Sequence, residues 1–248
     1  MRDLATMTWR AVRAAGATEI ALLPIGSQEQ HAGHLPMGTD TLLAETVTDA
    51  ALRRLDGNPS VVRLPCLPFG HSPHHLFAAA VSLSAETLLA VLTDVLDSLT
   101  QSGFRRVLIV NGHGGNDEVM RLAVKRFALR ADVALAACSY WSLTPPEPGV
   151  PGHAGWFETS LMLAAHPELV GSPTPRPPVI PLFDRPPHLG LTVERHGEWA
   201  RAGGGTDDPT DASAETGQRL LEARIDGLVA AIRAFDEATR ESHGKGER

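Results

Sequence analysis

Two short polar runs in this chain combine carboxylates with histidines, the residue types that bind divalent metal ions. The first run follows the apolar segment 20–25 and places Glu29, His31 and Asp40 within twelve residues. Glu29 and His31 stand two residues apart, so in an extended segment their side chains project to the same side. Carboxylate and imidazole together suit zinc, manganese or iron. We therefore predict a metal site that begins with these three residues.

Two later polar runs also carry a histidine, and one of them also carries a carboxylate. His113 follows the apolar segment 107–110 inside the run Asn-Gly-His-Gly-Gly-Asn, while His153 and Glu158 stand around the predicted start of a helix. Asp40 is also expected at a helix start, where the helix dipole keeps a carboxylate ionised and able to bridge two cations. With one carboxylate shared, two metal ions could be held by the five candidates Glu29, His31, Asp40, His113 and Glu158.

A pair of divalent ions at these residues would suit hydrolysis. The ions lower the pKa of a bridging water, so that a hydroxide forms at neutral pH, and they polarise a carbonyl oxygen. The departing nitrogen of an amide then needs a proton, and His153 is the candidate donor. Each residue alone has a simpler explanation, with His113 as a turn histidine and Glu158 as a carboxylate favoured by the helix dipole. The prediction rests on three clusters that all stand at strand–loop–helix breaks.

The elements that must position these residues alternate between strand and helix. Apolar runs predict strands over 19–25, 61–67, 104–110 and 133–140. Helical spacing predicts helices over 40–55, 84–102, 117–129, 158–165 and 214–238. Proline- or glycine-rich segments 142–150, 171–187 and 203–211 are expected to be loops. This alternation predicts a three-layer α/β/α fold with a mainly parallel sheet, in which the site lies at the carboxyl ends of the strands.

Composition is that of an ordinary globular protein. The 248 residues are 43% hydrophobic and 21% charged and show no linker, so we expect one domain over 1–240 and a frayed tail over 241–248. The formal net charge of -7 argues against a nucleic-acid partner. Without a signal-peptide core or an apolar run of roughly 20 residues, we expect a cytoplasmic protein with no membrane partner. Cys66 and Cys138 are expected to be buried free thiols.

Three motifs resemble those of the creatininase (creatinine amidohydrolase) family. The first is Leu-Pro-Ile-Gly-Ser-Gln-Glu-Gln-His over 23–31, continued by His-Leu-Pro over 34–36 and Thr39-Asp40. The second is Asn-Gly-His-Gly-Gly-Asn over 111–116, and the third is the run 153–160. The resemblance implies a creatininase-like fold, a dinuclear centre of zinc, manganese or iron, and hydrolysis of a non-standard or cyclic amide C–N bond. It also implies a homo-oligomer, often a hexamer.

Carried over by motif, the resemblance assigns a role to each candidate ligand. Glu29 and His113 would hold one metal and His31 the other, with Asp40 bridging them and His153 acting as the catalytic histidine.

The chain departs from creatininase at Gly115, two residues after the second-motif histidine, where creatininase has a glutamate. Glu158 is therefore expected to supply the missing ligand, and creatinine becomes a less favoured substrate. The segment 72–77 resembles the family's substrate loop, but Ala-Ala-Ala follows in place of Pro-Gly-Thr. Candidate substrate contacts are Ser72, His74, Trp141 and Trp156, of which the two tryptophans could equally well be structural.

Three functions remain open on the sequence. The first is hydrolysis of a small amide, such as a creatinine-like lactam, a formamide or a ring-opened nucleotide precursor. The second is a metallopeptidase that trims a ribosomally made precursor peptide, as in the family branch linked to mycofactocin maturation, with segment 171–187 forming or covering a groove. The third is a non-catalytic scaffold of the same fold, which ranks last because every candidate ligand is present.

Overall fold

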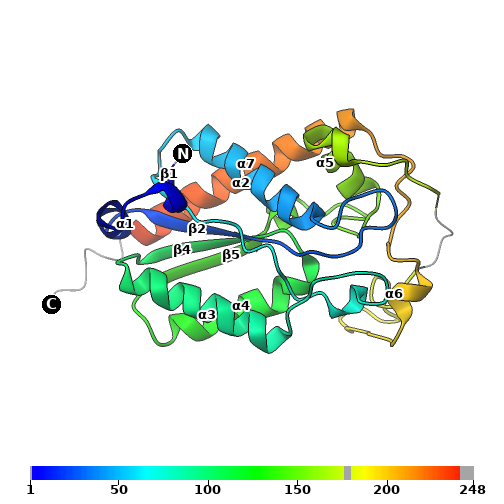
Figure 1. Ribbon diagram of the computed structural model, residues 1–248, viewed down its shortest axis with the longest axis horizontal. Helices are drawn as coiled ribbons and strands as arrows, with labels where there is room; N and C mark the ends of the chain where they lie inside the picture. Colours follow the sequence, from blue (N-terminus) through cyan, green and yellow to red (C-terminus); the bar gives the residue numbers. More distant parts are fainter. Residues whose placement is uncertain (1, 176–179, 241–248) are drawn as a thin grey trace.

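The computed structural model describes residues 2–175 and 180–240, and a five-stranded sheet runs through its middle (Figure 1). The strand order is β1-β3-β2-β4-β5, and each neighbouring pair is parallel. The strands are β1 (Arg2–Asp3), β2 (Ile20–Ile25), β3 (Val61–Arg63), β4 (Arg106–Asn111) and β5 (Ala134–Ser139). The helices are α1 (Trp9–Gly16), α2 (Thr39–Leu55), α3 (Ala85–Gln101), α4 (Asp117–Ala128), α5 (Trp156–Ala165), α6 (Glu198–Arg201) and α7 (Ala214–Arg240).

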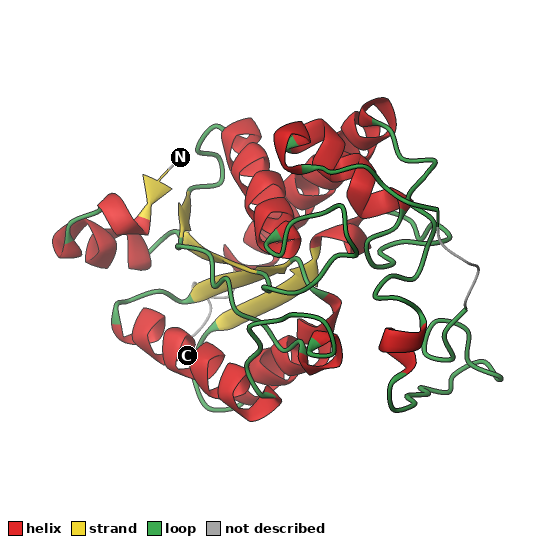
Figure 2. Cartoon of the chain, turned by 45° about the vertical axis from the view of Figure 1, so that its right-hand side comes forward, coloured by secondary structure: helices red, strands yellow, loops and turns green. Residues whose placement is uncertain are grey.

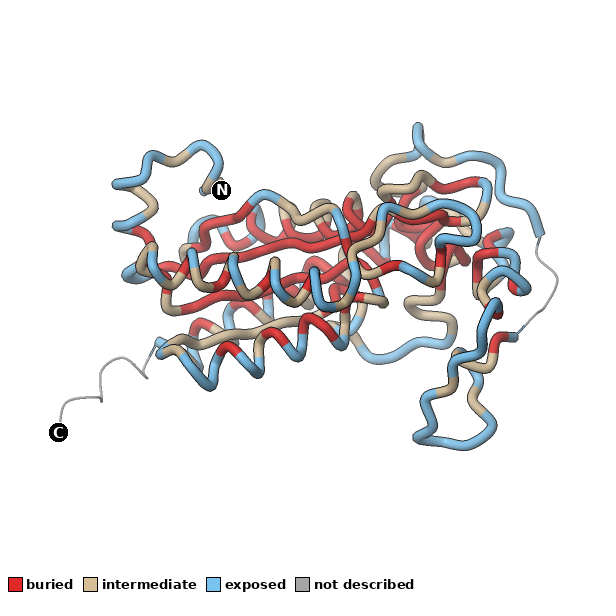
Figure 3. Tube along the Cα trace, turned by 60° about the horizontal axis from the view of Figure 1, so that its bottom comes forward, coloured by how far each residue is buried: buried red, intermediate tan, exposed pale blue. Residues whose placement is uncertain are grey.

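Helices cover both faces of the sheet because the central strands are apolar on both sides. Ile20 and Leu22 of β2 pack into one core with α2, α5 and α7, whereas Ala21 and Leu23 pack into a second core with α3 and α4. This alternation follows from the two-residue period of a strand. The central strands are accordingly buried along their length (Figure 3). The predicted three-layer α/β/α fold is confirmed.

The chain leaves β2 and β4 on opposite faces of the sheet. After β2 it forms α2 on one face and returns as β3, and after β4 it forms α4 on the other face and returns as β5. Because β2 and β4 are neighbours, their carboxyl ends lie where the connections diverge, which opens a crevice in parallel sheets. Loops gather at one end of the molecule (Figure 2).

Some predicted boundaries were wrong. The third strand ends at Arg63 instead of residue 67, because Pro65 has no N–H to donate to a neighbouring strand, and Leu67 pairs with Ile25 only as an isolated bridge. The short helices α1 and α6 were not predicted. The proposed tail, 241–248, lies outside the described residues, and the assignment of 1–240 to one domain stays a prediction.

Both cysteines are free thiols, as predicted, but each is half-buried and not buried. Burial raises the pKa of Cys66 and of Cys138 to about 12, which keeps both thiols protonated and poor metal ligands. Within residues 2–175 and 180–240, the helices are too short or too polar to cross a bilayer.

The contact between α5 and α7 leaves no room for a side chain at Gly217. A Cβ there would lie 1.8 Å from the carbonyl oxygen of Ser160 and 2.9 Å from the Cβ of Ala164. We expect G217A to lower the free energy of unfolding by about 1–3 kcal/mol, since overpacking outweighs the better helix propensity of alanine. Urea denaturation measures this, with G33A as control because a Cβ at Gly33 meets nothing within 4 Å. A G217A protein as stable as G33A would contradict the packing described.

Candidate metal centre

The crevice beyond β2 and β4 brings together the five predicted ligands. Glu29 and His31 follow β2, Asp40 lies in the first turn of α2, His113 follows β4, and Glu158 lies in the first turn of α5. They form two groups of possible ligands, Glu29–Asp40–His113 and His31–Asp40–Glu158, whose donor atoms lie within 4.8 Å of one another in each group. Asp40 belongs to both groups, as the sequence predicted for a bridging carboxylate.

Hydrogen bonding orients the imidazole in the first group. Nε2 of His113 lies 3.0 Å from the carbonyl oxygen of His71, to which it donates. The opposite nitrogen, Nδ1, is thereby turned toward the carboxylates, and it lies 3.2 Å from Oε2 of Glu29 and 3.1 Å from Oδ2 of Asp40. A backbone acceptor that fixes the tautomer in this way is typical of a metal-binding histidine.

The second group repeats this arrangement with the nitrogens exchanged. Nδ1 of His31 donates to the carbonyl oxygen of Glu29 at 3.1 Å. Nε2 then faces Oδ1 of Asp40 at 3.1 Å and Oε2 of Glu158 at 3.8 Å. Each group thus offers one imidazole nitrogen and two carboxylates around a common space.

The charges in the two groups favour a cation between them. Burial by itself would lower the pKa of His31, but the carboxylates of Asp40 and Glu158 raise it to about 10. Burial by itself would also lower the pKa of His113. The carboxylates of Glu29 and Asp40 outweigh this effect and hold the pKa of His113 well above its usual value. Burial raises the pKa of Glu158 to about 7 despite the opposing effect of His31. Protons on the histidines balance the carboxylates here, and divalent ions would do so more fully.

The donor set fits one divalent ion in each group. All five residues are no more than 5% exposed. Oε1 of Glu29 faces Nε2 of His75 at 3.2 Å, and Oδ2 of Asp40 faces Nδ1 of His113 at 3.1 Å. Buried carboxylates are costly unless positive charge balances them, and a divalent ion in each group would supply that charge. Mixed oxygen and nitrogen donors suit zinc, manganese and iron. Glu29 also lies within ligand distance of two other pairs, His74–His75 and His31–His153.

Gly115 has no space for the glutamate that creatininase carries there. A Cβ at Gly115 would lie 2.3 Å from the carbonyl oxygen of His71 and 2.5 Å from Nε2 of His113. The carboxylate in the second group instead comes from Glu158, whose Oε2 accepts the N–H of Ala154 at 2.6 Å. The expectation that Glu158 takes part in the second group agrees with this geometry.

A cavity of about 490 Å³ opens onto both groups. His74 and Trp141, two of the candidate substrate contacts, line it. Ser72 is fully buried, and its hydroxyl donates a short hydrogen bond to Oε2 of Glu29, so it holds a ligand in place and does not face the cavity. Trp156 lies outside the lining, with its ring edge-on to Phe157, because the first turn of α5 faces the core.

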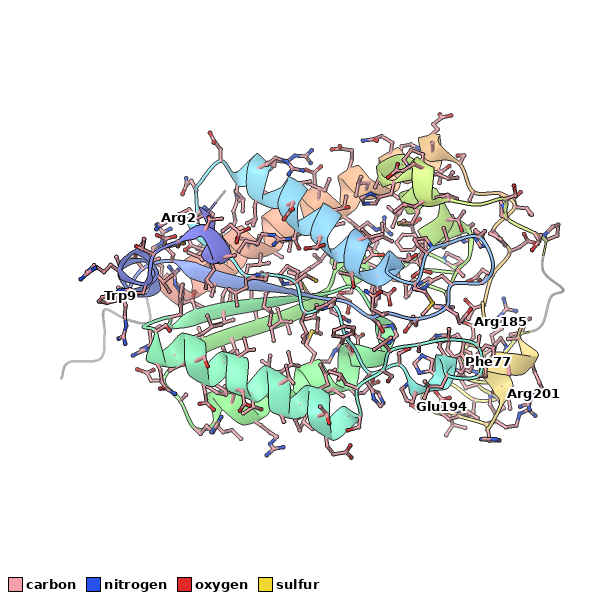
Figure 4. The ribbon with its side chains drawn as sticks, viewed as in Figure 1. Arg2, Trp9, Phe77, Arg185, Glu194 and Arg201 are labelled. Carbon is pink, nitrogen blue, oxygen red and sulfur yellow. The ribbon has the colours of Figure 1, made fainter. Side chains whose placement is uncertain are left out.

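Two residues of the cavity were missed as site residues by sequence analysis. His75 is buried, and its Nε2 lies 3.2 Å from Oε1 of Glu29; its place beside His74 was the available signal. Trp199 of α6 stacks on Phe183 with centroids 4.3 Å apart and meets His75 edge-on at 4.6 Å. No sequence periodicity marks such a short helix. Figure 4 shows Glu194, another lining residue, beside α6 at the end of the molecule opposite Trp9.

His153, the predicted catalytic histidine, lines the same cavity. Its Nε2 donates to the carbonyl oxygen of Gln30 at 2.8 Å, and Nδ1 lies 3.5 Å from Oε1 of Glu29. Burial, with the neighbouring His31 and His75, holds the pKa of His153 well below its usual value. The ring is therefore neutral, with a lone pair on Nδ1.

Comparison with known proteins identifies the family of the chain. The family model of creatinine amidohydrolase matches residues 5–232. The chain is 33% identical over 226 residues to a mycofactocin precursor peptide peptidase of Mycobacterium ulcerans, covering 85% of this chain and 83% of that protein. It is 30% identical over 256 residues to the creatinine amidohydrolase of Pseudomonas putida, covering 92% and 94%.

Solved creatininase structures share the fold. A manganese form superposes with a TM-score of 0.74 at 31% identity, covering 94% of this chain and 97% of that one. A zinc–zinc form of a creatininase variant gives 0.72 at 30% identity, with the same coverage. Family model, relatives and structures together show that this chain belongs to the creatininase family of metal-dependent amidohydrolases.

Proposed function

We propose that the protein hydrolyses the amide C–N bond of a small molecule at a dinuclear metal centre. One divalent ion would be held by Glu29, Asp40 and His113, and the other by His31, Asp40 and Glu158. The observation that carries this proposal is the shared Asp40, which lies 3.1 Å from an imidazole nitrogen on each side. The metals would be zinc, manganese or iron, and the solved creatininases with manganese or zinc support this choice.

When bound, the two ions supply Lewis acidity and lower the pKa of water. The surrounding side chains orient the Glu29 carboxylate and transfer the proton. Ser72 donates to Glu29, and His75 faces the other oxygen of the same carboxylate, so Glu29 keeps its orientation. His153 has a lone pair at Nδ1 and can take a proton there and pass it to the departing amine nitrogen. Burial of the ligands excludes bulk water and strengthens these interactions.

A peptidase remains a second candidate function, because the mycobacterial relative is named for cleaving a precursor peptide. A second cavity of about 450 Å³ shares His74, Glu194 and Trp199 with the first and is also lined by Phe77. Figure 4 labels Phe77 and Glu194 in this part of the molecule. Such a continuation could hold the chain of a peptide. The non-catalytic scaffold has no support, since the chain belongs to a family of hydrolases. The homo-oligomer and the cytoplasmic location stay predictions.

A substrate panel separates the two candidates. We expect the protein, loaded with zinc or manganese, to open small cyclic amides or cleave formamides, because the cavity at the metal groups is of small-molecule size. The products are followed by liquid chromatography with mass detection. The same reactions include synthetic peptides of about ten residues, a length that extends well past the metal groups. Cleavage of peptides without turnover of any small amide would replace the first proposal with the second.

Single ligand replacements should separate the two ions. We expect about two ions per wild-type chain, about one in H113A or E158A, and almost none in D40A, because Asp40 serves both groups. Elemental mass spectrometry on protein purified without chelators or an affinity tag measures this. E194Q is the control, since Glu194 lines the cavity outside both groups. Full metal content in D40A would contradict the bridging role.

Replacement of His153 should stop turnover while leaving both metals bound. We expect kcat of H153A to fall about 10²- to 10⁴-fold, the usual loss when a proton-transfer group is removed. H188A is the matched control because His188 is exposed and donates only within its own loop among the described contacts. Loss of one ion from H153A would show instead that His153 is a ligand, through the His31–His153 pairing with Glu29.

A further inference from the structure

The glycine-rich segment 203–207, predicted only as a loop, lies against the backbone of His153. The N–H of Thr206 donates to the carbonyl oxygen of His153 at 3.0 Å. The N–H of His153 donates in return to Oγ1 of Thr206 at 2.7 Å. Two reciprocal hydrogen bonds between segments 53 residues apart fix both the position and the direction of the peptide that carries the imidazole.

Asp207 sets the direction of the Thr206 hydroxyl. Oγ1 of Thr206 donates its proton to Oδ2 of Asp207 at 2.6 Å, so its lone pairs remain for the N–H of His153. Gly152 and Gly155 pack closely against the side chain of Asp207. A Cβ at Gly152 would lie 2.1 Å from Oδ2 of Asp207, and a Cβ at Gly155 would lie 2.5 Å from its Cβ. The segment 152–155 is therefore closed around Asp207.

The same turn also acts on the imidazole, through Gln30. The N–H of Ala32 donates to Oε1 of Gln30 at 2.9 Å, which fixes the orientation of the side-chain amide. Its NH₂ group then donates to the carbonyl oxygen of Gly204 and to Nδ1 of His75, both at 2.8 Å. Gly204 has φ +78°, and a Cβ there would lie 2.5 Å from Oε1 of Gln30. Only glycine allows the turn to approach the amide this closely.

These contacts leave His153 one orientation. The Gln30 amide nitrogen also lies 3.1 Å from Nε2 of His153, but both of its protons are directed to Gly204 and His75. Nε2 of His153 is therefore the donor to the main-chain carbonyl oxygen of Gln30 at 2.8 Å. The ring stacks on His75 with centroids 4.2 Å apart and an interplanar angle of 19°. Trp199 meets it edge-on at 5.5 Å. The contacts with Gln30, His75 and Trp199 thereby hold the His153 ring so that its Nδ1 faces Glu29.

We propose that residues 203–207 form a positioning turn for His153, in which Thr206 and Asp207 hold the backbone and Gly204 holds Gln30. The inference rests on the proposed function, because it takes His153 as the group that transfers the proton. Thr206 touches no reacting atom and acts through His153. Proton transfer depends on placement, and an error of about 1 Å can cost about 10²-fold in rate.

The test compares T206V with T206S. Valine has nearly the shape of threonine but cannot accept the N–H of His153, whereas serine keeps the hydroxyl. We expect kcat of T206V to fall about 10- to 100-fold with KM and metal content unchanged, and T206S to stay close to wild type. T210V is the control, since Thr210 is exposed on the same segment and bonds to Asp208. Thermal denaturation verifies that each variant is folded.

A spectroscopic measurement keeps this test separate from the proposed function. Imidazole ¹⁵N spectra of the full zinc-loaded chain should show one tautomer for His153, protonated on Nε2, and T206V should show a mixture. This readout needs no substrate, so it decides the positioning role even if no amide in the panel is hydrolysed. An unchanged His153 tautomer in T206V would overturn the proposal, and so would an equal loss of kcat in T206S.

Discussion

The burial of three carboxylates in one crevice is the constraint on which the rest of this structure depends. Glu29, Asp40 and Glu158 are almost without exposure and close enough to share two histidines. Charges buried in this way are stable only when opposite charges and hydrogen bonds surround them. Backbone carbonyls turn the second ring nitrogen of both histidines toward the carboxylates, so protons on these nitrogens or divalent ions between the groups can supply the balancing positive charge.

The sheet topology explains why the carboxylates can meet. The divergence of the chain after β2 and β4 leaves the crevice open, and the first turn of α2 brings Asp40 over it. The five candidate ligands come from four segments. Asp40 and Glu158 lie in the first turns of α2 and α5 and His113 lies just after β4, whereas Glu29 and His31 lie in the loop between β2 and α2. Helix starts and a strand end therefore hold three of the candidates, which suits a centre whose geometry must not relax when a cation binds.

The sequence allowed the ligands to be predicted better than their supports. Residue type and position predict Asp40 and His113 as candidates, because carboxylates and imidazoles are side chains that bind metals, and both belong to groups that could hold an ion. The groups that orient the histidines are main-chain carbonyls of Glu29, Gln30 and His71, and a carbonyl has no sequence signature. Trp199 could not be predicted for another reason: α6 has four residues, too few for an amphipathic period to appear.

The packing of α5 against α7 connects segment 203–207 and His153 to the core of the fold. His153 directly precedes α5, and segment 203–207 comes shortly before α7. Gly217 lets α7 approach the carbonyl of Ser160, and the N–H of Ser213 donates to the Ser160 hydroxyl at 3.2 Å. The beginnings of the two helices are thus joined, and the segments before them meet as the Thr206–His153 pair. The close packing of α5 and α7 at Gly217 thus joins the two helices that follow His153 and segment 203–207 in the chain, although Gly217 lies outside the metal groups.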